Sequence, residues 1–241
     1  MTITTFNIHE GVYAFEDTRL ATQKHRHPAL EIVIARRGSF QITDAGGTTR
    51  RARTALIRAN AAHAVDGGET ACEIWMFENE ASVLEALRRN LPTLTITSSV
   101  TVLDFPTEVF SSELLERLTQ ANARPIDRDA RVIASRQYIL DKVTEGDLTR
   151  DRLARLVHLS PDRLSHLFKE ELGISIQHYI AWTRLKYAIQ ITLEQACPLL
   201  EAAYQAGFYD AAHFSRSFAK MFGLNPSFAY NSSTVQIPPR K

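Results

Sequence analysis

The sequence predicts an α+β protein in which a β-rich N-terminal part is followed by an all-helical C-terminal part. Short runs of β-branched and aromatic residues, separated by turn residues, fill positions 5–77. From position 127 onward, apolar residues instead recur at helical spacing. Within that region, segments 153–169 and 199–218 each contain a short apolar helix, a tight turn and a second helix. This is the pattern of a helix-turn-helix motif, and it occurs twice.

The N-terminal strands are predicted from runs that end at turn signals. Residues 39–43 alternate in polarity at period two and stop at the hairpin signal Asp44-Ala45-Gly46-Gly47. The other runs are 31–35, 55–57 and 72–77, with a further turn at 66–68. Several short strands with frequent turns predict a small β-sandwich or barrel.

Helical patterns begin near residue 80. Residues 81–90 are predicted to form a helix that stops before Pro92, and a Thr/Ser-rich linker region is predicted to start at 94–106. Residues 110–121 form an amphipathic helix whose leucines face one side, so it either packs on its own domain or dimerises. The helical domain then opens with Asp127 as the expected cap of its first helix.

Between the two motifs, residues 175–193 predict a long helix capped by Ser175. At 1.5 Å per residue it spans about 28 Å, close to one turn of DNA. That length suits a connector between two DNA-reading units, and it equally suits a buried helix that joins two subdomains.

Composition fits an ordinary globular protein. Of 241 residues, 44% are hydrophobic and 23% are charged. Residues 1–125 carry 13 Lys and Arg against 15 Asp and Glu, whereas residues 126–241 carry 15 against 12, so the helical part is the basic one. Cys72 and Cys197 are predicted to be free thiols. Since neither a signal peptide nor a membrane span is evident, we expect a cytoplasmic protein.

In the first motif, Ser160 and Pro161 form a typical helix start, and Leu164, Leu167 and Phe168 share the buried face of the second helix. The polar residues then point elsewhere. Asp162, Ser165 and His166 share one face that suits base edges, whereas Arg163 and Lys169 suit the phosphate backbone.

In the second motif, Phe214, Phe218 and Phe222 are predicted to form the buried stripe. The opposite face presents four residues, Ala211, Ala212, Ser215 and Arg216. Arg216 is the best candidate for a bidentate contact to guanine, worth about 1–3 kcal/mol of discrimination. The alternative for both motifs is a solvated helix face without a partner.

Residues 127–228 resemble the AraC/XylS family of bacterial transcription regulators. The resemblance rests on Leu159-Ser160, Leu164, Phe168-Lys169, Gly173, Ser175, Tyr179, Arg184-Leu185, Ala188, Ala203, Gly207-Phe208, His213-Phe214-Ser215-Arg216-Ser217-Phe218, Phe222-Gly223 and Pro226. It implies two helix-turn-helix subdomains joined by a linker helix, with the polar faces named above turned to DNA. Where the family usually closes with Tyr-Arg, this chain has Ala229-Tyr230.

The N-terminal part resembles the cupin-type sensor domain of that family, a small β-barrel. The resemblance rests on His25, His27, Glu31 and His63, and it implies a site for a divalent transition metal or for an organic effector. Two histidines at i and i+2 of a strand face one side, so a carboxylate and a third imidazole can close such a site. Arg19 stands where a complete cupin motif has glycine.

These observations predict four regions. They are a cupin-like sensor domain (1–92), a linker with a candidate dimerisation helix (93–126), a double helix-turn-helix domain (127–230) and a tail (231–241). The predicted function is a sequence-specific DNA-binding transcription regulator, not an enzyme, that senses a small molecule or metal. Its expected partners are double-stranded DNA, a second copy of the chain and, for an activator, RNA polymerase, with no membrane partner.

Two alternatives to that function stay open. One is a metal-dependent cupin enzyme with a helical appendage, which the His and Glu set would serve. The other is a DNA-binding protein whose N-terminal part only dimerises.

Overall fold

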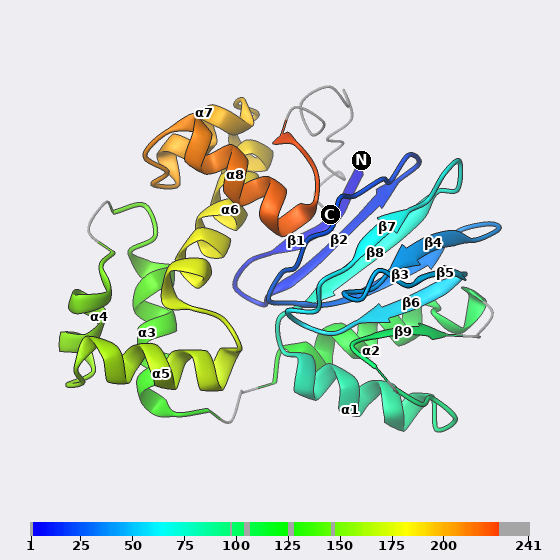
Figure 1. Ribbon diagram of the computed structural model, residues 1–241, viewed down its shortest axis with the longest axis horizontal. Helices are drawn as coiled ribbons and strands as arrows, with labels where there is room; N and C mark the ends of the chain where they lie inside the picture. Colours follow the sequence, from blue (N-terminus) through cyan, green and yellow to red (C-terminus); the bar gives the residue numbers. More distant parts are fainter. Residues whose placement is uncertain (1, 97, 104–106, 125–127, 146–147, 227–241) are drawn as a thin grey trace. The chain divides into compact units, whose positions relative to one another are not determined.

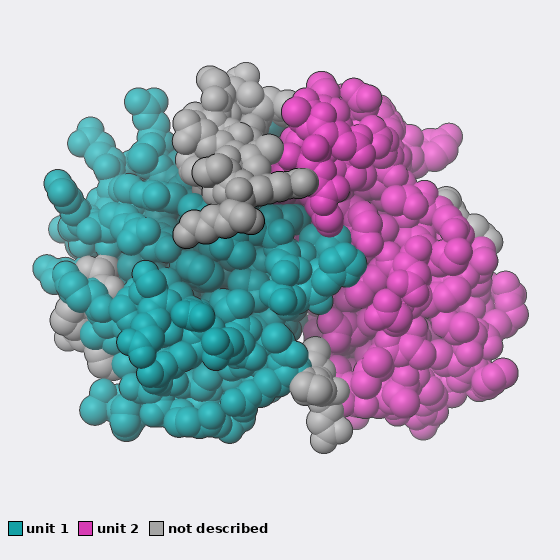
Figure 2. All heavy atoms as spheres, turned by 180° about the vertical axis from the view of Figure 1, so that it is seen from behind, with its two compact units in different colours: residues 1–125, 219–241 teal, residues 126–218 magenta. Residues whose placement is uncertain are grey.

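The computed structural model describes residues 2–96, 98–103, 107–124, 128–145 and 148–226. The chain divides into two compact units, which Figure 2 shows in different colours. Unit 1 comprises residues 1–125 and 219–241, and unit 2 comprises residues 126–218. The predicted tail, residues 231–241, lies outside the described residues. None of the described helices is both long and apolar enough to span a bilayer.

Unit 1 is built on two antiparallel sheets (Figure 1). The larger has the order β1-β2-β8-β3-β6-β9, and the smaller has the order β5-β4-β7. The strands are β1 (Thr2–Asn7), β2 (Val12–Asp17), β3 (Leu30–Ala35), β4 (Phe40–Thr43), β5 (Thr49–Ala52), β6 (Thr54–Ile57), β7 (Ala64–Asp66), β8 (Cys72–Phe77) and β9 (Val100–Leu103). The predicted hairpin turn at Asp44 joins β4 to β5, where the Gly47 N–H donates to the Asp44 carbonyl at 3.0 Å.

The two sheets do not form the closed cupin-like barrel that the sequence led us to expect. In the described residues no strand of the smaller sheet pairs with a strand of the larger one. Two isolated bridges, Ala21 with Asp66 and His25 with His63, join further segments to this region. Because neither sheet closes on itself, the structure supports the coarser prediction, a β-rich N-terminal domain.

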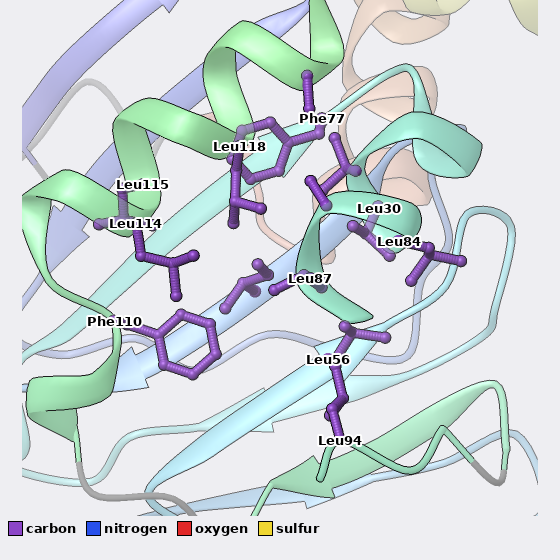
Figure 3. Close-up of a cluster of buried hydrophobic side chains, with 14 of the residues drawn as sticks. Leu30, Leu56, Phe77, Leu84, Leu87, Leu94, Phe110, Leu114, Leu115 and Leu118 are labelled. Carbon is purple, nitrogen blue, oxygen red and sulfur yellow. The ribbon is translucent and has the colours of Figure 1, made fainter. Parts of the chain in front are cut away.

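Two helices cover one face of the larger sheet. They are α1 (Glu80–Asn90) and α2 (Ser112–Asn122), and a short 3-10 helix, η1 (Thr107–Val109), precedes α2. Figure 3 shows leucines of both helices packed over Leu30, Leu56 and Phe77 of the sheet. The predicted leucine stripe of α2 therefore faces the core of its own unit. Residues 94–106, where we expected the linker to start, also contain β9, which pairs with β6.

Leu118 is the fully buried residue of that stripe, at 0% exposure. Replacing it with alanine should lower the free energy of unfolding by about 2–5 kcal/mol, because the leucine contacts are lost and the packed neighbours close the cavity only partly. Urea unfolding followed by circular dichroism measures this. Gln120→Ala, at an exposed position of the same helix, is the matched control and should change stability little.

Unit 2 is helical. Its elements are α3 (Ala130–Asp141), α4 (Arg150–Leu156), α5 (Pro161–Leu172), α6 (Ile176–Gln195), α7 (Leu199–Gln205) and the start of α8 (Ala211–Phe222). Ser160 and Ser175 cap α5 and α6, as predicted, since each hydroxyl accepts a hydrogen bond from a backbone N–H three residues later. The observed cap of α3 is Asp129, whose carboxylate accepts the Arg131 N–H, whereas Asp127 lies outside the described residues.

The core of unit 2 includes the predicted buried faces. Leu164 and Phe168 of α5 are fully buried and belong to one cluster with α3, α4 and the start of α6. Phe214 and Phe218 of α8 are buried as well. Phe222 differs from the prediction, because it is only half-buried and Met221 is the buried residue at this end of the helix.

Candidate DNA-reading helices and effector site

The first helix-turn-helix motif consists of α4, a turn and α5. The Leu159 N–H donates to the Ala154 carbonyl at 2.9 Å and closes the turn. His158 takes a positive φ of 54° there, which helps the chain reverse between the helices. Ser160 then caps α5, and Gly173, at φ 71°, ends it.

The second motif, α7, a turn and α8, repeats this backbone pattern. The Phe208 N–H donates to the Ala203 carbonyl at 3.0 Å, and Gly207 takes the positive φ, 88°. Asp210 caps α8 by accepting the His213 N–H at 2.5 Å. Gly223, at φ 67°, ends this helix as Gly173 ends α5. The two motifs are therefore structural repeats, each with one helix that offers a polar face.

The predicted DNA-reading residues lie on the exposed faces of α5 and α8. On α5, Ser165 is half-buried, and its hydroxyl donates to the Pro161 carbonyl at 2.8 Å, which leaves its oxygen free to accept. On α8, Arg216 is exposed. The remaining exposed members are Asp162, Arg163, His166, Lys169 and Ala212, and the other half-buried members are Ala211 and Ser215.

One interaction at the first reading face was not predicted from the sequence. Arg150, at the start of α4, lies 3.2 Å from a carboxylate oxygen of Asp162. Both side chains are largely exposed, so the pair adds little stability. It does place a positive charge beside the one acidic residue among the predicted base-reading positions. That charge would offset the repulsion between Asp162 and DNA phosphates.

The second candidate site is the cluster of His25, His27, Glu31 and His63 in unit 1, whose four side chains are all buried. His25 and His27 precede β3, Glu31 is the second residue of β3, and His63 directly precedes β7. A backbone bridge holds the first and last histidines side by side, with N–H to carbonyl distances of 2.9 and 3.0 Å. The structure thus brings together all four residues that the sequence grouped.

Hydrogen bonds orient these imidazoles. Nδ1 of His25 lies 2.9 Å from the Gln23 carbonyl, and Nδ1 of His63 lies 3.0 Å from the Ala61 carbonyl. A carbonyl only accepts, so both Nδ1 atoms carry the proton, and in the neutral ring Nε2 keeps a lone pair. Nε2 of His63 and Nε2 of His27 lie 2.9 and 2.8 Å from the same Glu31 oxygen. The cluster has one carboxylate at its centre.

Charge in this cluster is unevenly shared. Burial opposes ionisation of Glu31, but the charges and hydrogen bonds of His63 and His27 outweigh it and lower the Glu31 pKa well below its usual value. Burial also disfavours charge on His63, yet Glu31 outweighs it and raises the His63 pKa. For His25, burial together with the neighbouring histidines lowers the pKa to about 3. His25 is therefore a neutral imidazole near pH 7.

This donor set fits a first-row divalent ion. The four ligand atoms all lie within 4.8 Å of one another. Three imidazoles and a carboxylate suit zinc, iron, nickel or copper better than magnesium or calcium, which prefer oxygen ligands. Carbonyl groups that fix the outer nitrogen of ligating histidines are the usual support of such sites. His25 and His63 have that support here.

Comparison with known proteins identifies the helical part. Residues 153–230 match the family model of a helix-turn-helix domain. The arabinose operon regulatory protein of Escherichia coli (strain K12) is 33% identical over 126 residues, which cover 50% of this chain and 43% of that protein. The transcriptional regulator GlxA of Rhizobium meliloti is 32% identical over 87 residues, 36% of this chain and 27% of the relative.

The helical part of this chain contains an AraC-type helix-turn-helix domain. This confirms the resemblance of the helical part to AraC-type regulators, which the sequence predicted. The curated relatives match over less than half of their own length, so the resemblance concerns this domain and not the complete regulators.

Solved structures extend the likeness to the fold of nearly the whole chain. Apo ToxT from Vibrio cholerae strain SCE256 aligns with a TM-score of 0.61 over 93% of this chain and 97% of that chain, at 13% identity. A ToxT structure from the same strain with a bound unsaturated fatty acid aligns with a TM-score of 0.54, at 14% identity. At these identities the match supports a shared fold, a β-rich domain followed by an AraC-type domain.

Proposed function

We propose that this chain is a sequence-specific DNA-binding transcription regulator whose N-terminal domain senses a small effector. The observation that carries the proposal is the repeated helix-turn-helix, in which a side chain caps the start of both α5 and α8 and both helices turn a polar face outward. A recognition helix of this kind enters the major groove with its N-terminal residues at the base edges. The named regulators that share this domain support the same function.

The reading residues follow from the exposed faces. On α5, Asp162, Ser165 and His166 would face bases, with Arg163 and Lys169 on the phosphates. On α8, Arg216 would contact a guanine, and Ser215, Ala211 and Ala212 would line the groove beside it. Helix α6 has 20 residues, or about 30 Å, which suits two reading helices one DNA turn apart.

His25, His27, Glu31 and His63 form the proposed sensing site, and they would hold a divalent transition metal. When bound, the ion would cross-link segment 25–27, strand β3 and the segment before β7. The alternative is an organic effector, which the ToxT structure with a bound fatty acid supports for a domain of this fold. If the domain is of the cupin type, it could hold either kind of ligand. A ligand of either class regulates only if it binds two states of the protein with different affinities.

A second copy of the chain and, for an activator, RNA polymerase remain the proposed protein partners. The buried leucines of α2 pack in the core of their own unit and are not available to a partner. A dimer through α2 would therefore use its outer, polar face. The alternative function, a metal-dependent enzyme, would account for the His and Glu cluster but leaves the repeated motif without a role.

Selection of tight-binding DNA from a random pool, followed by hydroxyl-radical footprinting, tests this function. We expect two protected patches about 10 base pairs apart. Ser165→Glu should remove one patch and Ser215→Glu the other, because each places a carboxylate on one reading face. Ala134→Glu, at an exposed position on α3, is the charge-matched control and should leave both patches. If the selection enriches no DNA sequence from the pool, the protein is not a sequence-specific regulator.

A further inference from the structure

Tyr209 is a residue that the second motif has and the first lacks. The residues of positive φ, His158 and Gly207, are 49 positions apart in the sequence. The helix caps, Ser160 and Asp210, are 50 positions apart. One additional residue therefore lies between the turn and the cap of the second motif. Since the half-buried Leu159 matches Phe208 by the turn-closing hydrogen bond, that residue is Tyr209.

The fold of the motif gains little from the Tyr209 side chain. Phe208 on one side is buried, and Asp210 on the other caps α8, so both neighbours have their structural roles. Tyr209 itself is 90% exposed, more than any other large exposed hydrophobic residue in the described part of the chain. An aromatic side chain left in water contributes no burial energy. Its use would therefore be contact with a partner.

The position of Tyr209 favours DNA as that partner. It directly precedes the cap of α8, at the N-terminal end of the helix, which is the end that enters the major groove. Sugars and phosphates run along the rim of that groove. A tyrosine hydroxyl is among the groups that donate hydrogen bonds to phosphate oxygens, and an aromatic ring can cover a deoxyribose.

The second motif also needs such a contact more than the first. Counting from the caps, Asp162 on α5 corresponds to Ala212 on α8, and Lys169 corresponds to Ala219. At these two positions the second reading helix has neither a polar group for bases nor a cation for phosphates, and its exposed Lys220 lies one position further along. Tyr209 brings a hydroxyl to the N-terminal end of this helix, where a backbone contact would replace them.

We propose that Tyr209 binds the DNA backbone beside the groove read by α8, with its hydroxyl donating to a phosphate and its ring against the sugar. The inference rests on the DNA-binding function proposed above. It adds affinity that does not depend on sequence to the motif with fewer reading groups. Because the tyrosine is uncharged, this affinity does not depend on the release of counterions.

The test is fluorescence anisotropy of the full chain with its selected DNA and with random DNA, over a range of salt concentrations. Tyr209→Ala should raise Kd by about 3- to 10-fold on both DNAs alike, and Tyr209→Phe should raise it by a smaller factor. Neither should change the slope of log Kd against log salt, whereas Lys169→Ala should flatten it. Ile133→Ala, another exposed apolar position in unit 2, is the control and should bind as the parent does.

Three results would overturn the inference. An unchanged Kd for Tyr209→Ala would show that Tyr209 makes no contact with the DNA. A loss confined to the selected DNA makes Tyr209 a base reader, and an altered melting temperature of the free protein makes it structural. If the parent chain itself binds no DNA, the proposed function fails first, so the two failures are distinguishable.

Discussion

We expect the protein to take up one ion per chain after its metal is removed with a chelator and zinc, nickel, iron or manganese is added back. The His63→Ala variant is expected to lose this ion. His63 is fully buried, its Nδ1 is held by a backbone carbonyl, and its Nε2 lies on the Glu31 carboxylate. Alanine removes one of the four donor groups of the cluster. We expect affinity to fall by more than the roughly 10- to 100-fold that loss of an outer-shell partner costs.

Elemental analysis by mass spectrometry gives the stoichiometry, and thermal melting gives an independent readout. An ion at 100 times its Kd should stabilise the parent by about 2.7 kcal/mol, and it should not stabilise the variant. His9→Ala, which removes an exposed histidine of the same unit, is the matched control and should keep the ion. Glu31→Gln keeps the shape of the side chain and should weaken binding without unfolding the site.

Absence of an ion after reloading with all four metals would contradict this prediction. The three histidines and Glu31 would then be the polar lining of a site for an organic effector, and the search would turn to small molecules. The DNA-binding assignment would be untouched, since it depends on other residues in other elements.

The sequence predicted the helical part well because its signals are local. Ser160 and Ser175 lie where a hydroxyl can reach the third following N–H, and both cap as expected. The strand β9 was missed because its evidence is not local. Residues 100–103 sit in a Thr/Ser-rich stretch, and only pairing with β6, more than 40 positions earlier, makes them a strand.

In the site of unit 1, too, the local features were predicted from the sequence and the long-range contacts were not. The spacing of His25 and His27 indicated one face, and in the structure Glu31 and His63 lie together with them. The sequence alone could not give the backbone bridge between His25 and His63, nor the carbonyls that fix both Nδ1 atoms. Closure of the barrel was predicted from a resemblance, and it failed because strand pairing is decided by contacts between distant segments.

Arg216→Ala is expected to lower affinity for the selected DNA by about 1–3 kcal/mol and to relax the preference at one base step. Arg216 is the exposed cation on the reading face of α8, where the neighbouring reading positions are alanines and a serine. Its planar guanidinium matches the O6 and N7 acceptors of guanine in a way that no other residue on that face can. Binding to random DNA should therefore change much less.

Lys169→Ala is the contrast to Arg216→Ala, because a phosphate contact weakens binding to all sequences alike and reduces the salt slope by about one unit. Arg216→Lys sharpens the comparison, since lysine keeps the charge but lacks the rigid planar fork of the guanidinium. If Arg216 reads a base, the lysine variant should lose discrimination and keep the salt slope. Equal losses on selected and random DNA would instead assign Arg216 to the backbone, and α8 would then position the protein while α5 reads the sequence.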